Sequence, residues 1–311
     1  MIRILLLLVG LLLLIFHAYI SPLSTQTQFV IFLVGIVLLG VPHGAADLLV
    51  ANQTADHAKR NFSKFSFLFT YIGRLGMFAA ILWFFPVVGN FLFIAFAAYH
   101  FGETDLHRFK TNTIAGKLFV FSYGLLILGV ILLQHFHELK PLFAFFESGR
   151  ENENLISFID SKKYLLLSIC TVFFFASTFF YFSSTPNDQT DSGYFLLQLA
   201  VLLLLLFHLP MLIGFTFYFI VWHSVLSLTN IVIYLRRNNV YAPGVILKQI
   251  VFYSGLAMAG VSMVGFGGFM FVNTNTILVY VFLGLAVLTA PHMQIMHDMY
   301  NRLRLDKQHG L

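Results

Sequence analysis

The chain is dominated by apolar runs that are long enough to cross a lipid bilayer. A membrane-spanning helix needs about 20 mostly apolar residues. The sequence contains about ten such runs, at 2–20, 28–51, 65–86, 88–106, 115–134, 164–182, 194–209, 211–235, 245–270 and 276–300. Only 10% of its 311 residues are charged, whereas a soluble domain carries roughly 25%. We therefore expect an all-α, polytopic transmembrane helix bundle of about ten spans, forming a single integral membrane domain over residues 1–311.

Basic residues gather in alternate loops between these runs, and this pattern predicts the orientation. Cytoplasmic loops of membrane proteins carry an excess of lysine and arginine. The basic clusters that fall on one side of a ten-helix bundle are Arg3, Lys59 with Arg60 and Lys64, Arg108 with Lys110 and Lys117, Arg236 with Arg237 and Lys248, and Arg302 with Arg304 and Lys307. We expect this side and both termini to be cytoplasmic, in the inner (plasma) membrane. Loop charge then accounts for the net charge of +5, which does not indicate nucleic-acid binding.

Two connections fit this scheme less simply than the others. The segment 185–193 holds only two charged residues, Asp188 and Asp191. The segment 138–163 lies between the fifth and sixth runs, is long and carries charges of both signs. We expect it to form a loop.

Four histidines lie inside the apolar runs, at His43, His100, His223 and His292. Ionisable residues within membrane helices usually face the bundle interior and mark a site or a pathway. The four belong to the second, fourth, eighth and tenth runs, which travel in one direction. A rise of 1.5 Å per residue places them about 18 to 24 Å from the start of each run. The imidazoles should therefore share one layer in the cytoplasmic half, where they could hold one metal ion.

The donor set limits the metals that such a site would take. The single cysteine, Cys170, excludes a multi-cysteine site within one chain. Asp47 follows His43 by four residues, so it lies one helical turn away and could orient a ligand imidazole. Glu103 and Asp105 follow His100 by three and five residues, with solvation at the inner membrane face as their alternative role. Neutral imidazole suits iron, zinc, copper and nickel, so the residues alone leave iron oxygen chemistry and zinc hydrolysis both open.

Four short motifs occur in order from the second run to the last. They are Pro-His-Gly-Ala at 42–45 with Asp47, His-Phe-Gly at 100–102 with Asp105, Trp-His-Ser at 222–224, and Pro-His at 291–292. Together they resemble the Brp/Blh family of membrane β-carotene 15,15′-dioxygenases, the bacteriorhodopsin-related protein family. The resemblance implies an Fe²⁺-dependent enzyme that cleaves the central double bond of β-carotene with O₂. The two all-trans retinal molecules formed would serve a microbial rhodopsin.

The resemblance also implies roles for individual residues. His43, His100 and His223 would be the catalytic metal ligands, His292 would be the fourth ligand, and Asp47 and Asp105 would fix the tautomers of ligand imidazoles. The apolar substrate would enter from the membrane lipid.

One position departs from the family pattern. Family members often carry a second histidine four residues after the histidine of Trp-His-Ser, where this chain has Ser227. His292 or His297 could supply the missing donor, or metal affinity could be reduced. Two alternatives therefore stay open: a non-catalytic or weakly active rhodopsin or retinal accessory protein, and another histidine-ligated membrane iron oxygenase acting on an apolar lipid.

Two further classes are disfavoured by the sequence. A membrane desaturase needs clustered histidine boxes, which this sequence lacks. A transporter would place its ionisable groups at several depths rather than in one layer.

Overall fold

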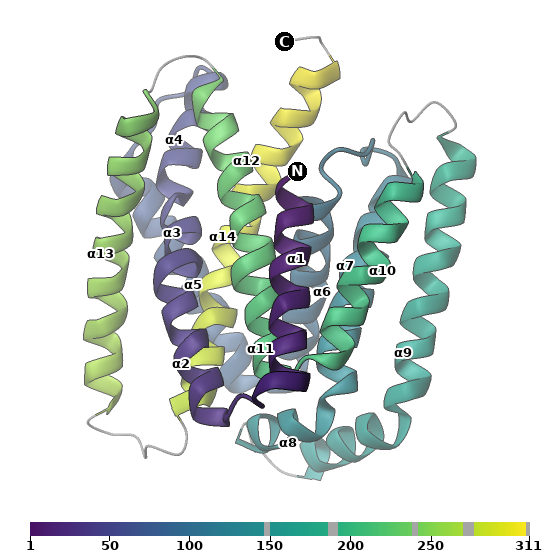
Figure 1. Cartoon of the computed structure of the whole chain (residues 1–311). Helices are drawn as coiled ribbons and strands as arrows, with labels where there is room; N and C mark the ends of the chain where they lie inside the picture. The colour runs from purple at the N-terminus through teal and green to yellow at the C-terminus, as the bar shows by residue number, and fades with distance from the viewer. Residues whose placement is uncertain (146–149, 186–191, 238–241, 270–276, 309–311) are drawn as a thin grey trace.

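The computed structural model describes residues 1–145, 150–185, 192–237, 242–269 and 277–308. This part of the chain is helical and contains no strand, and the helices lie side by side (Figure 1). In chain order, with η marking π-helical segments, the elements are α1 (Ile2–Ile15), η1 (Phe16–Ile20), α2 (Thr25–Gly35), η2 (Ile36–Gly40), α3 (Val41–Ala45), α4 (Asp47–His57), α5 (Lys64–Phe84), α6 (Pro86–Asp105), α7 (Ile114–Gln134), α8 (Phe136–Phe145), α9 (Arg150–Ser184), α10 (Ser192–His208), α11 (Met211–Phe215), η3 (Thr216–His223), α12 (Ser224–Arg236), α13 (Pro243–Phe269) and α14 (Ile277–Gln308).

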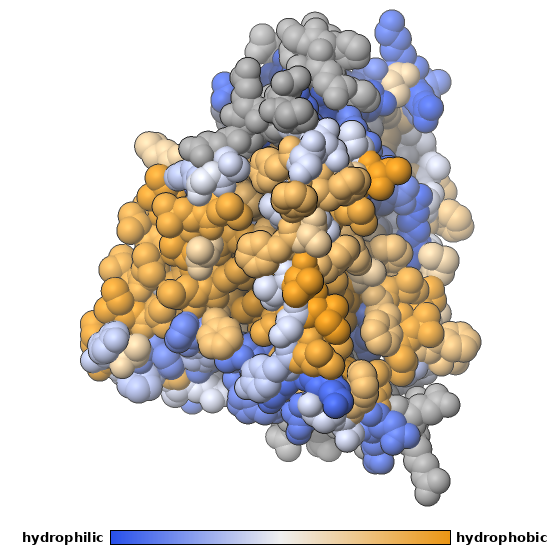
Figure 2. Space-filling view, turned by 90° about the vertical axis from the view of Figure 1, so that its right-hand side faces the viewer, coloured by the Kyte–Doolittle hydropathy of each residue, from blue (hydrophilic) through white to orange (hydrophobic). Residues whose placement is uncertain are grey.

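Each of the ten predicted apolar runs overlaps a helix or a continuous series of helices. Within the described residues, six helical segments are long and apolar enough to cross a membrane: Ile2–Ile20, Thr25–His57, Lys64–Phe84, Ile114–Gln134, Glu153–Ser184 and Met211–Arg236. Figure 2 shows a broad hydrophobic band across one face of the molecule, with hydrophilic residues at its margins. An all-helical membrane protein is therefore supported. The count of ten spans stays a prediction, as does the cytoplasmic position of the termini, although α1 begins and α14 ends toward the same end of the bundle (Figure 1).

The expectation of a loop over 138–163 is wrong for the described part of that segment. Helix α8 ends at Phe145 and α9 begins at Arg150. The mixed charges pair with one another: Lys140 Nζ donates to Asp160 Oδ2 at 2.6 Å, and Lys163 Nζ lies 3.6 Å from Asp160 Oδ1. Charges of opposite sign can thus sit on helices where the sequence suggested a loop.

Helices α6 and α7 approach each other closely because glycines lie at their contact. A Cβ atom built on Gly102 of α6 would collide with the backbone carbonyl oxygen of Val120. One built on Gly124 of α7 would collide with the carbonyl oxygen of Ala98. Small residues permit this backbone approach between membrane helices, and here it fixes the part of α6 that carries His100.

Candidate metal centre

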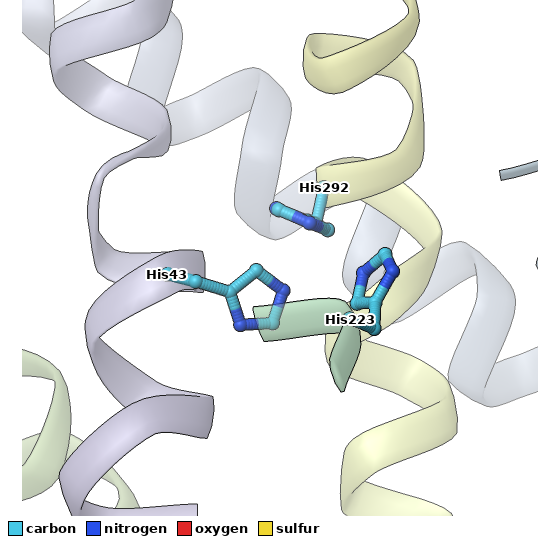
Figure 3. Close-up of side chains that lie close together, drawn as sticks. All are labelled: His43, His223 and His292. Atoms are coloured by element: carbon cyan, nitrogen blue, oxygen red, sulfur yellow. The ribbon is translucent and has the colours of Figure 1, made fainter. Parts of the chain in front are cut away.

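Three of the predicted histidines lie together in the interior of the bundle. His43 from α3, His223 from the end of η3 and His292 from α14 turn their rings toward one another (Figure 3). One ring nitrogen from each can be chosen so that all three lie within 4.8 Å of one another. The side chains are 5%, 0% and 4% exposed. Three converging nitrogens, shielded from solvent, are suited to binding a metal ion.

His100 lies beside this triad and completes a group of four imidazoles. Its Nε2 is 3.1 Å from Nε2 of His223, and its ring centroid is 5.2 Å from that of His292. Two nitrogens that each lie about 2.1 Å from one ion, at roughly a right angle, are about 3.0 Å apart. The distance between His100 and His223 therefore matches that of neighbouring ligands on a common ion.

Three of the four histidines lie beside a proline or in a π-helical segment. His43 directly follows Pro42, between π-helical η2 and the break at Ala46 that separates α3 from α4. His223 is the last residue of η3, a π-helical segment of 8 residues, and His292 follows Pro291 inside α14. Proline removes a backbone hydrogen bond, and π-helical turns are frequent at functional sites. These irregularities alter the direction in which each side chain leaves its helix.

Hydrogen bonds on the outer side of the rings select which nitrogen faces inward. His292 Nδ1 donates to Asp47 Oδ1 at 2.7 Å, and Asp47 Oδ2 accepts a bond from the hydroxyl of Tyr71 at 3.1 Å. His43 Nδ1 lies 3.1 Å from the hydroxyl of Ser224. Because a neutral imidazole carries one N–H proton, a proton on Nδ1 of His292 leaves Nε2 with a free electron pair that can bind a metal ion.

One nitrogen left over by these bonds fits a metal ion. His292 Nε2 is buried and has no hydrogen-bond partner among the described residues. Buried polar atoms are nearly always satisfied, so this unpaired nitrogen, in a ring turned toward His43 and His223, supports a metal ion bound at this point. The Asp47 contact to His292 is the carboxylate–histidine arrangement that orients metal ligands.

Comparison with known proteins agrees with this geometry. The family model described as "Beta-carotene 15,15'-dioxygenase" matches residues 34–300, a range that includes all four histidines. This chain belongs to that family. A curated protein named beta-carotene 15,15'-dioxygenase, from uncultured marine bacterium 66A03, is 24% identical over 265 residues, which cover 83% of this chain and 89% of the relative. No solved structure matches the chain.

The two aspartates predicted to orient imidazoles differ in their contacts. Asp47 contacts an imidazole directly, but that imidazole belongs to His292 rather than to its neighbour in sequence, His43. Asp105 bonds no imidazole in the described contacts. Its Oδ2 accepts hydrogen bonds from Tyr123, Tyr218 and Trp222, so any influence on the imidazoles passes through Trp222, the neighbour of His223.

His292 and His297, the two residues considered as substitutes for the absent histidine at position 227, also lie in different surroundings. Ser227 is fully buried on α12. His292 lies in the triad, whereas His297 Nδ1 bonds the carboxylate of Glu103 at 3.0 Å and its Nε2 lies 2.8 Å from Asn301 Nδ2. His292 is therefore the available extra nitrogen donor.

The sequence patterns did not single out a second buried network that joins α6 to α14. Glu103 is 1% exposed and pairs with Arg304 at 2.6 Å. Arg304 also donates to Thr111 Oγ1 at 2.7 Å. The sequence placed Arg304 among the charges of a cytoplasmic loop, and it carries no pattern that predicts a buried ion pair for this residue. The network binds together the two helices that carry His100 and His292.

We expect Asp47→Asn to weaken metal binding by about 10-fold to 100-fold, the usual effect of removing a partner of a ligand histidine. The neutral amide cannot raise the basicity of the His292 ring as a carboxylate does. Competition against a coloured chelator with Zn²⁺ and Fe²⁺ would measure the affinity. Asp56→Asn is the matched control, since Asp56 is exposed on the same helix α4. Equal affinities for Asp47→Asn and the control would contradict the role assigned to Asp47.

Proposed function

We propose that this protein cleaves the central 15,15′ double bond of β-carotene with O₂, releasing two molecules of all-trans retinal. The observation that carries the proposal is the group of four buried imidazoles, with an unpaired Nε2 on His292, in a chain of the β-carotene 15,15′-dioxygenase family. Fe²⁺ is the proposed metal, since imidazole donors without thiolate suit non-haem iron.

His43, His223 and His292 would hold the ion, with His100 as the fourth ligand. When bound, Fe²⁺ would supply the redox chemistry between O₂ and the polyene. Asp47 and Ser224 hold two of the rings by their Nδ1 atoms. Fixed ring orientations keep the ligand set assembled before substrate arrives.

Apolar side chains surround the group and exclude water. Phe101 meets the His223 ring edge-on at a centroid distance of 4.8 Å, and Phe219 stacks on the same ring at 6.1 Å. A dry site suits a hydrocarbon substrate and protects reactive species from side reactions with water. The position of a polyene held by such walls would determine which double bond is cleaved.

Gly44, the neighbour of His43 in the sequence, faces open space. A Cβ atom built on Gly44 would have no described atom within 4 Å. β-Carotene is insoluble in water, so we propose entry from the lipid toward this side of α3. The finer topology belongs to the same proposal: a single domain with ten spans in the plasma membrane, both termini cytoplasmic, and retinal passed to a microbial rhodopsin.

Expression in a bacterial host that accumulates β-carotene tests the function. We expect loss of the orange pigment and appearance of retinal as the sole C20 aldehyde, identified by chromatography. Cleavage under ¹⁸O₂ measures how many aldehyde oxygens come from dioxygen, and a dioxygenase should place label in both products. The purified protein should contain about one iron per chain.

Other results would favour the alternatives. Bound iron without retinal would indicate an iron oxygenase acting on a different apolar lipid. Absence of both, with retinal formed only when an active relative is also expressed, would indicate an accessory protein. Retinal formed by protein free of iron would overturn the metal assignment.

A further inference from the structure

Asp105 is a buried carboxylate that the histidine site does not use directly. The residue is 1% exposed. Its Oδ2 accepts bonds from Tyr123 at 2.8 Å, Trp222 Nε1 at 3.0 Å and Tyr218 at 3.2 Å, while its Oδ1 has no hydrogen-bond partner in the described part of the chain. All three donors are neutral. A buried charge without a counter-charge is strongly unfavourable, so a cation is expected nearby.

Arg3 supplies a cation at this point. Its guanidinium donates to the backbone carbonyl oxygen of Asp105 at 2.5 Å. It also lies over the ring of Trp222, at 5.9 Å from the centroid, within the range of a cation–π interaction. The Trp222 side chain thus contacts Arg3 through its ring and Asp105 through its N–H group.

The rest of α1 is fitted to the same surface. Leu6 and Leu7 are buried, and a Cβ atom built on Gly10 would lie 2.6 Å from a Leu205 methyl carbon and 2.7 Å from the Phe217 ring. Arg3, Leu6, Leu7 and Gly10 have the spacing of one helix face. Phe217 and Trp222 both belong to η3, the segment that ends at His223. Helix α1 therefore packs closely on the element that presents a proposed ligand.

We propose that Arg3 is a positioning residue of the proposed active site. Its positive charge balances the Asp105 carboxylate, which accepts a hydrogen bond from Trp222. Trp222 in turn fixes the end of η3, where His223 joins the triad. Helix α1 lies outside residues 34–300, the range that the family model matches, so the family assignment does not predict this role. The catalytic part of the proposal rests on the proposed function; the structural coupling does not.

The chain offers a direct reporter of this coupling. Its two tryptophans are Trp83, which is 72% exposed, and Trp222, which is 1% exposed. In a Trp83→Phe background, the emission of Trp222 therefore reports on the Arg3 and Asp105 contacts. The variants are Arg3→Gln, Arg3→Lys, Asp105→Asn and the double variant Arg3→Gln with Asp105→Asn. Lys117→Gln is the control, because it removes one positive charge from an exposed position at the start of α7.

We expect Arg3→Gln to shift the Trp222 emission to longer wavelength and to lower both iron content and retinal formation, the latter by at least about tenfold. Arg3→Lys should restore most of the loss by keeping the charge. In the Asp105→Asn background, the same Arg3→Gln change should alter each readout by a clearly smaller factor than in the parent, because only the bond to the backbone carbonyl and the contact with the Trp222 ring are then lost, and no buried charge is left unbalanced. Lys117→Gln should match the parent.

Two results would overturn the proposal. One is an unchanged Trp222 emission and iron content in Arg3→Gln. The other is an Arg3→Gln effect of equal size with and without the Asp105 charge, which would indicate that the arginine contributes only general stability. If the parent protein makes no retinal, the proposed function fails, while emission and metal content still decide the role of Arg3.

Discussion

Replacing His43 and His223 together with alanine is expected to abolish retinal formation and metal binding. The double variant removes two of the three imidazoles of the triad and leaves His292 with only His100. One or two nitrogens in an enlarged cavity cannot hold a divalent ion as four can. We expect a fall in activity of at least about 1,000-fold, equivalent to roughly 4 kcal/mol of barrier.

The measurement is retinal produced per milligram of membrane protein, together with the metal content of the purified variant. His208→Ala is the matched control, because His208 is exposed and bonds the carbonyl oxygen of Leu204 on its own helix. Membranes of the double variant that still cleave β-carotene at the parental rate would refute the metal assignment. His100→Ala separately tests the fourth ligand: four-nitrogen binding predicts weaker Fe²⁺ affinity than in the parent.

The apolar runs and the histidine layer were predictable because they depend on local sequence and on the bilayer. The length of each run determines a helix, and the alternation of loops gives its direction. Equal depth on parallel helices then places His43, His223 and His292 at one level, and the structure brings them together. The sequence cannot show that the helices concerned are neighbours, and this became known only from the packing.

The partners of the carboxylates were beyond the reach of sequence spacing. Asp47 is one turn from His43 in sequence, yet it bonds His292, which is 245 positions away. Asp47 begins a new helix after the break at Ala46, and His292 lies on a helix that is distant in the sequence, so spacing along one regular helix does not predict their contact. Asp105 likewise accepts hydrogen bonds from Tyr218 and Trp222, which lie on another helix of the bundle. Long-range pairing of buried polar groups depends on tertiary packing, so local periodicity carries no signal for it.

The close contact of α6 with α7 gives the second large expected effect. We expect Gly124→Ala to lower the free energy of unfolding by about 3 kcal/mol or more, because a methyl group there has to displace the backbone of α6 at Ala98. Gly102→Ala should do the same through Val120. Overpacking against backbone is costly, since backbone cannot change rotamer as a side chain can. Displacement of α6 would also move His100, so metal affinity should fall with stability.

Thermal unfolding in detergent and the fraction of folded protein recovered from membranes would measure this effect. Gly76→Ala is the matched control: Gly76 lies inside α5, is exposed, and a Cβ there would have no described atom within 4 Å. By helix propensity alone, alanine is more favourable than glycine by about 1 kcal/mol, so the control should be neutral or slightly stabilised. If Gly124→Ala were as stable as Gly76→Ala, α6 and α7 would have to lie farther apart, and the position of His100 beside His223 would lose its structural support.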